Sequence, residues 1–317
     1  MDPLAEVLAL LRLENQTFFH RQLVKPWGLA VPAQNEYMPV YIVQGASCYL
    51  TLAGTNGSVL VEDGDIICLP QGGSHRWQDD LTSVVEPLVV QPVEEGLYKY
   101  AVPVPSALRS APNVTTTFLF AGGFHVTSGL AQPMRAALGT SIHVRPHQEA
   151  CQQWVSSVVA LLCMETRMGQ PGSQTAIARL MDVLFIHLIR ERLAQHRQAG
   201  QPCNGGFLSV MFDPDLSKAV GLIHQQPEHG WTVAELASVV GLSRTAFATR
   251  FSAIAGIPPL SYVRQWRMLK ATDLLAHSAT PLAEIAEHIG YDSVAAFSSA
   301  FKREIGVAPG TYRQQRR

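Results

Sequence analysis

The pattern of apolar and polar positions divides the chain into a β-rich first part and a helical second part. Between about residue 20 and residue 130, short apolar runs are separated by turns that contain glycine, proline, asparagine or aspartate. The clearest runs are 41–43, 48–52, 58–61 and 115–120. Short strands at regular spacing are typical of a β-barrel or a β-sandwich. A barrel or sandwich is therefore predicted for this part of the chain.

After Pro146 the spacing of apolar positions changes to that of helices. Two helices are predicted, one through Trp154, Val158, Leu161 and Leu162 and one through Ile177, Leu180, Leu184, Leu188 and Ile189. Glycine and proline at 169–172 interrupt the pattern between them. We therefore expect an antiparallel helical hairpin from about residue 147 to about residue 196.

The second helix of this hairpin carries an apolar stripe at helical spacing, made of Ile177, Met181, Leu184 and Leu188. Exposure of such a stripe on a monomer is unfavourable. A second copy of the chain or the barrel can cover it, and the first alternative predicts a homodimer. The polar, glycine-containing stretch 194–206 follows and is predicted to be a linker. The expected domains are therefore 1–205 and 206–317.

Signals for helix starts and stops are dense in the last hundred residues. A first helix is predicted from Asp215 to Gln226, and Thr232 with Glu235 has the pattern of a capping box that starts the next helix. Further signals predict a helix capped by Ser243 and ending near Ala255, a long helix from Pro259 to about His277, a helix with Pro281 at its first position, and a short closing helix that contains Tyr312.

The same helix pair occurs twice in this region. Residues 233–241 match residues 282–290 at an offset of 49, with alanine, glutamate, an aliphatic residue, alanine and glycine in register. One extra residue in the second turn changes the offset to 50, and the positions shared after it are Phe247, Phe251, Gly256, Pro259 and Tyr262 with Phe297, Phe301, Gly306, Pro309 and Tyr312. Matched turns, caps and phenylalanine pairs indicate a duplicated structural unit rather than two unrelated helix pairs in a bundle.

The second helix of each copy has a core face and an outward face. Phenylalanines at a spacing of four must face the core. The opposite faces carry small, polar or basic side chains, namely Thr245, Ala248, Thr249 and Ser252 in the first copy and Ala295, Ser298, Ser299 and Lys302 in the second. Such a face fits the major groove of DNA, and basic residues at its edges are expected to contact phosphates: Arg244, Arg250, Lys302 and Arg303.

Composition is that of an ordinary globular protein, with 47% hydrophobic residues, 15% charged residues and a net charge of −1. From Asp215 onward there are 11 Lys and Arg against 8 Asp and Glu, whereas the rest of the chain has 13 against 17, a distribution that permits a nucleic-acid partner for the C-terminal part.

The chain starts without the basic segment of a signal peptide, and its apolar runs are shorter than the about 18 residues of a membrane span. We therefore expect a cytoplasmic protein without a membrane partner. The five cysteines form no CxxC pair and are expected to be reduced thiols.

The segment 285–313 resembles the signature of AraC/XylS-type transcription regulators, and this resemblance covers about residues 213–317. The family's fold implies two helix-turn-helix units joined by a rigid helix, here 259–277, so that two recognition helices enter successive major grooves on one DNA face. Carried over from the family, the base-reading positions are Arg244, Thr245, Ala248 and Thr249 in the first unit and Val294, Ala295, Ser298 and Ser299 in the second. Relatives often have Arg, Gln or Glu at the positions of Thr249, Val294 and Ser299. The second helix is therefore expected to rely on phosphates, methyl contacts and DNA shape.

A second resemblance concerns the β-rich part. Gly64, Pro70, Gly72 and His75 have the spacing of the second signature motif of cupin barrels. The metal-dependent cupins that this motif resembles hold a cation with this histidine together with two His and a Glu from an earlier motif. Here the upstream segment has no His and no suitably placed Glu, and Tyr41 occupies approximately the ligand position. No metal, cofactor or catalytic residue is therefore predicted.

The order of cupin-like barrel, helical hairpin and double helix-turn-helix also resembles one AraC branch whose N-terminal domain senses a signal. The expected effector is a small molecule or an oxidant, and the candidate pocket residues are Tyr41, Cys48, Cys68 and His75. An oxidant sensor needs an accessible thiolate of low pKa, whereas burial in the core is the default for such cysteines.

One further group of metal-capable side chains is His143, His147 and Cys151, which recur at a spacing of four. On one helix they would align. Pro146 is expected to start the helix, however, and this leaves His143 on the preceding segment, so surface and packing roles are favoured over a metal site.

Together these patterns predict an α+β two-domain fold, with a cupin-like barrel and helical hairpin followed by an all-α double helix-turn-helix domain. The leading prediction for function is a signal-responsive transcription regulator that binds double-stranded promoter DNA, with RNA polymerase as a further candidate partner. Two alternatives stay open: a metal-dependent cupin enzyme fused to a DNA-binding domain, and an architectural DNA-binding protein whose barrel only dimerises. Elemental analysis tests the first alternative, and ligand-dependent DNA affinity tests the second.

Overall fold

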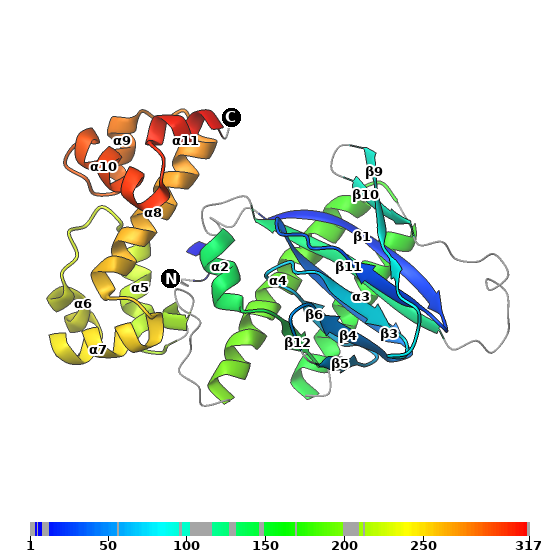
Figure 1. Ribbon diagram of the computed structural model, residues 1–317. Helices are drawn as coiled ribbons and strands as arrows, with labels where there is room; N and C mark the ends of the chain where they lie inside the picture. The colour runs from blue at the N-terminus through cyan, green and yellow to red at the C-terminus, as the bar shows by residue number, and fades with distance from the viewer. Residues whose placement is uncertain are drawn as a thin grey trace. The chain divides into compact units, whose positions relative to one another are not determined.

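The computed structural model describes residues 4, 6–7, 13–55, 57–94, 97–101, 116–126, 131–145, 149–168, 170–198, 209–211 and 213–315 (Figure 1). The chain divides into two compact units. One contains Met1–Arg12, Val126–Ala137 and Leu193–Arg317, and the other contains Leu13–His125 and Leu138–Arg192. The expected domain boundary after residue 205 stays a prediction, because residues 199–208 lie outside the described residues.

The unit that starts at Leu13 is built on two five-stranded sheets. The first has the order β1 (Leu13–Val24), β11 (Thr116–Val126), β3 (Tyr37–Gly45), β6 (Ile66–Cys68) and β12 (Ile142–Val144). The second has the order β5 (Ser58–Val61), β4 (Cys48–Leu52), β7 (His75–Gln78), β2 (Gly28–Val31) and β8 (Glu86–Pro87), and β9 (Val89–Glu94) pairs separately with β10 (Leu97–Ala101). The four short apolar runs predicted as strands are confirmed in β3, β4, β5 and β11, and only Thr115 of the last run lies outside the described residues.

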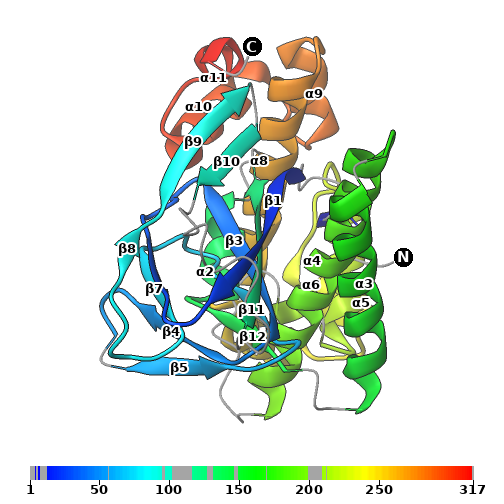
Figure 2. The same cartoon turned by 90° about the vertical axis from the view of Figure 1, so that its right-hand side faces the viewer.

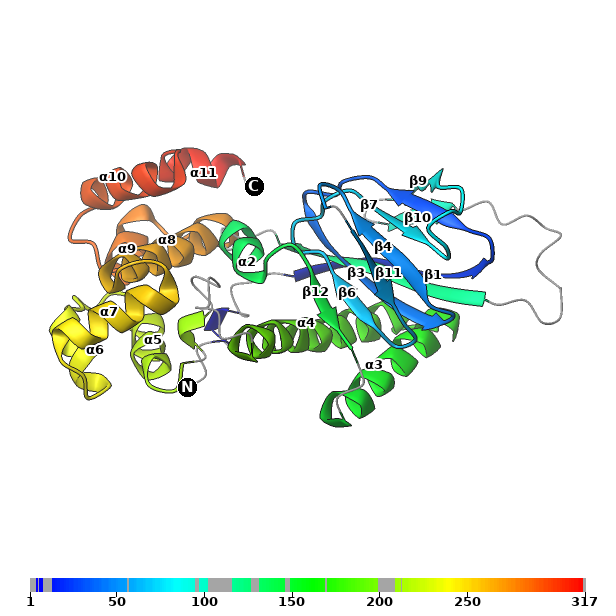
Figure 3. The ribbon, with the colours of Figure 1, turned by 60° about the horizontal axis from the view of Figure 1, so that its bottom comes forward.

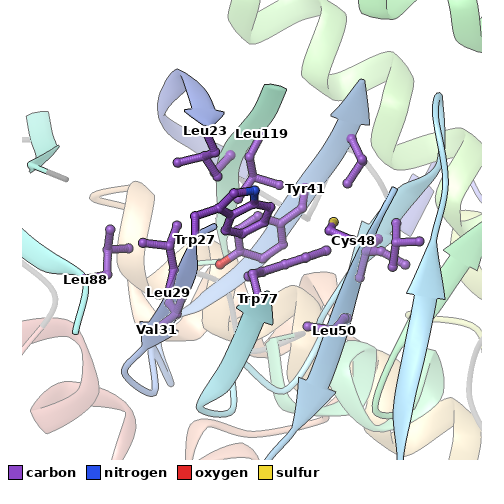
Figure 4. Close-up of a cluster of buried hydrophobic side chains, with 14 of the residues drawn as sticks. Leu23, Trp27, Leu29, Val31, Tyr41, Cys48, Leu50, Trp77, Leu88 and Leu119 are labelled. Atoms are coloured by element: carbon purple, nitrogen blue, oxygen red, sulfur yellow. The ribbon is translucent and has the colours of Figure 1, made fainter. Parts of the chain in front are cut away.

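The core of this unit lies between the two sheets. Figure 4 shows Tyr41 and Leu119 from the first sheet pointing toward Leu29, Leu50 and Trp77 from the second. Burial of large aromatic and aliphatic side chains on both inner faces stabilises the barrel, because each removes apolar surface from water.

The turn that carries the cupin-like motif depends on glycine. Gly64 and Gly72 both adopt positive φ, at 84° and 62°. A Cβ on Gly72 would lie 2.2 Å from the carbonyl oxygen of Gln34, whose own N–H donates to the Gly72 carbonyl at 2.7 Å. Only glycine fits at this position, which lies three residues before His75.

The predicted helical hairpin is confirmed as α3 (Glu149–Met168) and α4 (Ser173–Gln198), which lie side by side (Figures 2 and 3). A short helix, α2 (Ala131–Leu138), precedes β12. Phe185 of α4 packs against Phe124 of β11, with ring centroids 4.7 Å apart. Residues 194–198 belong to α4, so the linker predicted from residue 194 onward does not include them.

The apolar stripe on α4 is covered within the chain. Met181, Leu184 and Leu188 are at most 1% exposed. Of the two alternatives for covering this stripe, the structure favours burial inside the unit over a second copy. Leu161, expected to face the core from α3, is instead 42% exposed. Among the described residues, no helix is both long and apolar enough to cross a membrane.

All regular elements in the described residues of the C-terminal part are helices. Its helices are α5 (Leu216–Gln225), α6 (Val233–Val239), α7 (Arg244–Ala255), α8 (Pro259–His277), α9 (Leu282–His288), α10 (Val294–Ile305) and α11 (Pro309–Gln315). Figure 1 shows the long helix α8 running from the pair α6 and α7 to the pair α9 and α10. The predicted helices are confirmed to within one or two residues. Pro281 is the N-cap of α9 rather than its first helical residue.

Candidate nucleic-acid interface and barrel pocket

The two helix pairs have the same local chemistry. The Ser243 hydroxyl accepts the N–H of Ala246 at 3.2 Å, and the Ser293 hydroxyl accepts the N–H of Ala296 at the same distance. Gly256 and Gly306 end α7 and α10 in the left-handed region, at φ of 73° and 90°. N-cap serine and C-terminal glycine satisfy backbone groups that a helix end leaves unpaired. The structure thus confirms the duplicated unit.

The aromatic cores repeat as well. Phe251 packs edge-on against Tyr262 with centroids 5.5 Å apart and an interplanar angle of 82°. Phe301 packs against Tyr312 at 5.5 Å and 77°. Thr232 and Glu235 form the predicted capping box at the start of α6, with both reciprocal bonds present. Each recognition helix is therefore fixed on its core side by equivalent contacts.

The outward faces of α7 and α10 carry the residues expected to read bases. Six of the eight are exposed: Arg244, Thr245 and Thr249 on α7, and Val294, Ala295 and Ser299 on α10. The equivalent residues Ala248 and Ser298 are half-buried. Lys302 and Arg303 are exposed near the C-terminal end of α10. These faces have the small, polar and basic character that a major groove accommodates.

Arg250 differs from the other expected DNA-contacting residues. Its guanidinium donates to the Asp213 carboxylate, with a shortest distance of 2.9 Å, and to Asp215 Oδ2 at 2.9 Å. The hydrogen bond to Asp213 is the main cause that raises the pKa of Arg250. The side chain predicted to contact phosphate is therefore engaged within the chain.

Arg267 on α8 is a residue that the sequence analysis missed. Its Nε donates to the carbonyl oxygen of Pro227 at 2.6 Å, and its terminal nitrogens donate to the carbonyls of Gly290 at 3.1 Å and His229 at 2.9 Å. These bonds join the loop before α6 to the turn between α9 and α10. No sequence signal could have found them, because the acceptors are backbone carbonyls, which every residue carries.

In the barrel, Tyr41 and His75 form a buried pair. His75 Nε2 lies 2.7 Å from the Tyr41 hydroxyl, and His75 Nδ1 lies 2.8 Å from the Gly73 carbonyl. Burial lowers the pKa of His75 to about 4, so the imidazole is neutral at neutral pH. Since a carbonyl can only accept, Nδ1 donates to Gly73 and Nε2 accepts from the tyrosine hydroxyl.

This pairing does not fit the metal site of an enzymatic cupin. A histidine ligand needs a free ring nitrogen and several converging partners, whereas both ring nitrogens of His75 are engaged and Tyr41 supplies a phenol. No group of three His, Cys, Asp or Glu in the described part of the chain is placed to hold a metal ion. His143 lies on β12, where it pairs with buried Asp65 at 2.7 Å. His147 and the side chain of Cys151 lie outside the described residues.

A pocket of about 440 Å³ opens beside His75 at one end of the second sheet. Most of its lining is apolar and includes Val31, Leu52 and Leu88, and Arg76 and Ser74 add polar groups. Its size falls within the about 300–1,000 Å³ typical of small-molecule sites. Of the four residues expected to form an effector pocket, the structure places His75 in its lining, and Tyr41 is hydrogen-bonded to His75.

The two cysteines expected near the pocket are core residues. Cys48 and Cys68 are fully buried on β4 and β6. Burial raises the pKa of each thiol to about 12. Since an oxidant sensor requires a thiolate, these two side chains do not suit that role.

Comparison with known proteins identifies a family for each part of the chain. A family model described as Cupin matches residues 2–194, and one described as Helix-turn-helix domain matches residues 236–315. The HTH-type transcriptional regulator AlkR of Acinetobacter baylyi is 28% identical over 317 residues, which cover 99% of this chain and 100% of that protein. A putative AraC-like transcription regulator of Streptomyces antibioticus is 30% identical over 321 residues, which cover 99% of each.

Among solved structures, an AraC-type regulator from Chromobacterium violaceum is 28% identical, with a TM-score of 0.31, over 32% of this chain and 92% of that one. The full-length sequence relatives and the two family matches carry the assignment. The chain belongs to the AraC-like transcription regulators, and it is a DNA-binding protein with an N-terminal cupin domain and a C-terminal double helix-turn-helix.

Proposed function

We propose that the protein regulates transcription in response to a small molecule, and that both helix-turn-helix units of one chain read successive major grooves on one face of promoter DNA. The observation that carries this proposal is the repeated recognition helix, with equal caps, equal aromatic cores and equivalent outward faces in α7 and α10. The base-reading residues are those exposed on these faces together with Ala248 and Ser298, and Lys302 and Arg303 contact phosphates.

The test selects target duplexes from a random DNA pool with the full-length protein and then footprints the selected site. Protection of two segments about 10 base pairs apart on one face is expected, because that spacing is one helical turn. Protection of a single groove would contradict the two-reader arrangement. Arg244→Ala and Thr249→Ala should weaken binding to the selected site more than binding to unrelated DNA, whereas Arg179→Ala, a control at an exposed residue of α4, should change neither.

The pocket beside His75 is the proposed effector site. Its apolar lining with Arg76 and Ser74 at hand favours a small, largely apolar ligand with one polar group. A thermal-shift screen of metabolites on the full chain should yield ligands that also change DNA affinity. Ala53→Trp, which fills the pocket, should abolish both effects, and Leu60→Trp on exposed β5 serves as the control because Leu60 does not line the pocket.

We further propose that the cupin domain is not an enzyme. We also propose that the protein acts as a homodimer in the cytoplasm, where promoter DNA is found, and that it contacts RNA polymerase when it is bound to DNA. The engaged nitrogens of His75 support the first point. Stoichiometric metal lost in His75→Ala would revive the enzyme alternative. Effector-independent DNA affinity in all screens would favour the architectural alternative.

A further inference from the structure

We propose that Arg250 is a positioning residue, which ties the chain segment entering the DNA-binding domain to the first recognition helix through Asp213 and Asp215, and that it does not contact phosphate. This inference rests on the proposed reading of DNA by α7. The ion pairs of Arg250 lie outside the face of α7 that reads DNA, and their role is to hold this helix in position.

The contacts of Arg250 with Asp213 and Asp215, here called the tie, have a specific geometry. One terminal nitrogen of Arg250 donates to both oxygens of Asp213, at 3.1 and 2.9 Å, and the other donates to Asp215 Oδ2 at 2.9 Å. Asp213 Oδ1 also accepts the backbone N–H groups of Asp215 and Leu216, at 3.1 and 2.9 Å. Asp213 therefore joins the first turn of α5 and the side of α7 in one hydrogen-bonded group.

Charge argues against a phosphate role for Arg250. Two carboxylates already face its guanidinium, so the group of three side chains carries a net negative charge. The Asp213 side chain is only 11% exposed, and moving Arg250 to a phosphate would leave this carboxylate without its cation. An uncompensated carboxylate with little solvent access is unfavourable.

The place of Arg250 on α7 explains how the tie would act. Arg250 lies between buried Phe247 and Phe251 in sequence and follows exposed Thr249 directly. Neighbouring helix positions point about 100° apart, because a turn contains 3.6 residues. A contact that fixes Arg250 therefore also fixes the rotation of α7 about its axis, and with it the direction of Thr245 and Thr249.

The chain provides its own comparison for this feature. At the repeat offset of 50, the counterpart of Arg250 in the second copy is Ala300, a buried residue that is 6% exposed. The tie is thus specific to the first reader. The ion pairs of Arg250 also lie next to the segment through which the chain enters the domain, because Ser209, Val210 and Met211 are buried just before Asp213. A displacement of this segment would be transmitted to α7 through the carboxylates of Asp213 and Asp215.

The test measures binding of the full-length protein to a duplex that it selects from a random pool. Asp215→Asn is the informative variant, because the Asp215 side chain makes no capping bond to α5. We expect this variant to bind about two- to fivefold more weakly, as for loss of a partly exposed ion pair. If Arg250 were instead a phosphate ligand, Asp215→Asn would remove a competing carboxylate and strengthen DNA binding. Stronger binding by this variant would therefore overturn the proposal.

Two further readouts separate positioning from phosphate contact. Arg250→Ala should leave the dependence of log affinity on log salt unchanged, whereas loss of a phosphate contact would reduce its slope by about 0.9. The double variant Arg250→Ala with Asp215→Asn should lose no more affinity than Arg250→Ala alone, because both changes break the same tie. A reduced salt slope, or additive losses, would contradict the tie. Asp182→Asn on α4 is the matched control and should change nothing.

Amide hydrogen exchange judges the tie independently of DNA. Asp215→Asn and Arg250→Ala should accelerate exchange in α7 and leave α10 unchanged. Unchanged exchange in α7 would overturn the proposal even where DNA binding is normal. A wild-type protein that protects only one groove would instead refute the two-reader function, while the exchange result would still decide whether Arg250 holds α7.

Discussion

At the scale of single residues, the neutral His75 makes the barrel sensitive to acid. Burial lowers its pKa from 6.5 to about 4. Between these two values the unfolded chain binds a proton that the folded chain does not, so the free energy of unfolding falls as the pH drops from 6.5 toward 4. The stability that is lost over this range amounts to about 3 kcal/mol, and it is fully present above pH 6.5.

Chemical unfolding of the full chain at several pH values, followed by tryptophan fluorescence, measures this effect. The His75→Gln variant removes the titrating group and should lose clearly less stability than the wild type over the same pH range. Equal losses in both proteins would mean that other groups account for the acid sensitivity.

Phosphate contact is expected of the exposed Lys302 on α10. Lys302→Ala should weaken binding to specific and unrelated DNA alike, and it should lower the slope of log affinity against log salt by about 0.9, because one phosphate fewer is neutralised. Titrations of the selected duplex at several salt concentrations test this. Lys25→Ala, the same change at an exposed site in the cupin unit, is the control and should leave the slope unaltered.

Residue identities predicted exposure better than they predicted partners. The outward positions of α7 and α10 follow from periodicity, because the phenylalanines fix which face is buried. Arg250 shares the basic character of Arg244, and only the folded chain brings it beside Asp213, from which it is separated by 37 residues. Pattern also placed Tyr41 at the ligand position of the barrel, but the bond from its hydroxyl to His75 required the register of two sheets.

At the scale of elements, the two turns of the repeat respond differently to the same change. Gly241 and Gly290 both adopt positive φ, at 68° and 79°. A Cβ on Gly241 would meet nothing within 4 Å, whereas a Cβ on Gly290 would lie 2.6 Å from the Glu228 carbonyl oxygen and 2.8 Å from an Arg267 nitrogen. Gly241→Ala should therefore cost about 1 kcal/mol of left-handed strain, and Gly290→Ala about 3 kcal/mol through added overlap.

Thermal unfolding of the two variants compares these costs directly. Because the turns are copies of one another, each serves as the control for the other. Equal destabilisation would show that the close approach of Glu228 and Arg267 to Gly290 does not hold the second helix pair in place.

Element boundaries were predictable where the signal is local. The Ser243 cap, the Thr232 capping box and the proline start of α8 each act within a few residues, and the structure confirms all three. The end of α4 was not predictable from polarity alone. Residues 194–198 are polar but include alanine, glutamine and arginine, which are good helix formers, so they extend the helix instead of starting the linker.

At the scale of the whole molecule, sequence periodicity predicted that the α4 stripe is covered but not what covers it. Helical spacing specifies an apolar face, and either the barrel or a second chain satisfies it. The structure buries Met181, Leu184 and Leu188 inside one chain. A dimer interface on the hairpin would therefore use other residues, and the large apolar side chains exposed in the described part of the hairpin include Leu161 and Met164 on α3 and Val183 on α4, at 42%, 46% and 42%.

A homodimer formed through α3 is the expected assembly. Leu161 and Met164 are three residues apart and share one helix face, so a second copy can cover both. Dimerisation makes the second DNA-binding event intramolecular, which raises apparent affinity by a factor of about 10² to 10⁴ when the linker spans both sites. Leu161→Glu combined with Met164→Glu should therefore give a monomer that binds promoter DNA more weakly by up to this factor. Val84→Glu, at a residue that is 81% exposed outside the hairpin, should leave the dimer intact. Analytical ultracentrifugation with and without DNA decides the matter, since a wild-type protein that stays monomeric at tens of micromolar in both conditions rules the dimer out.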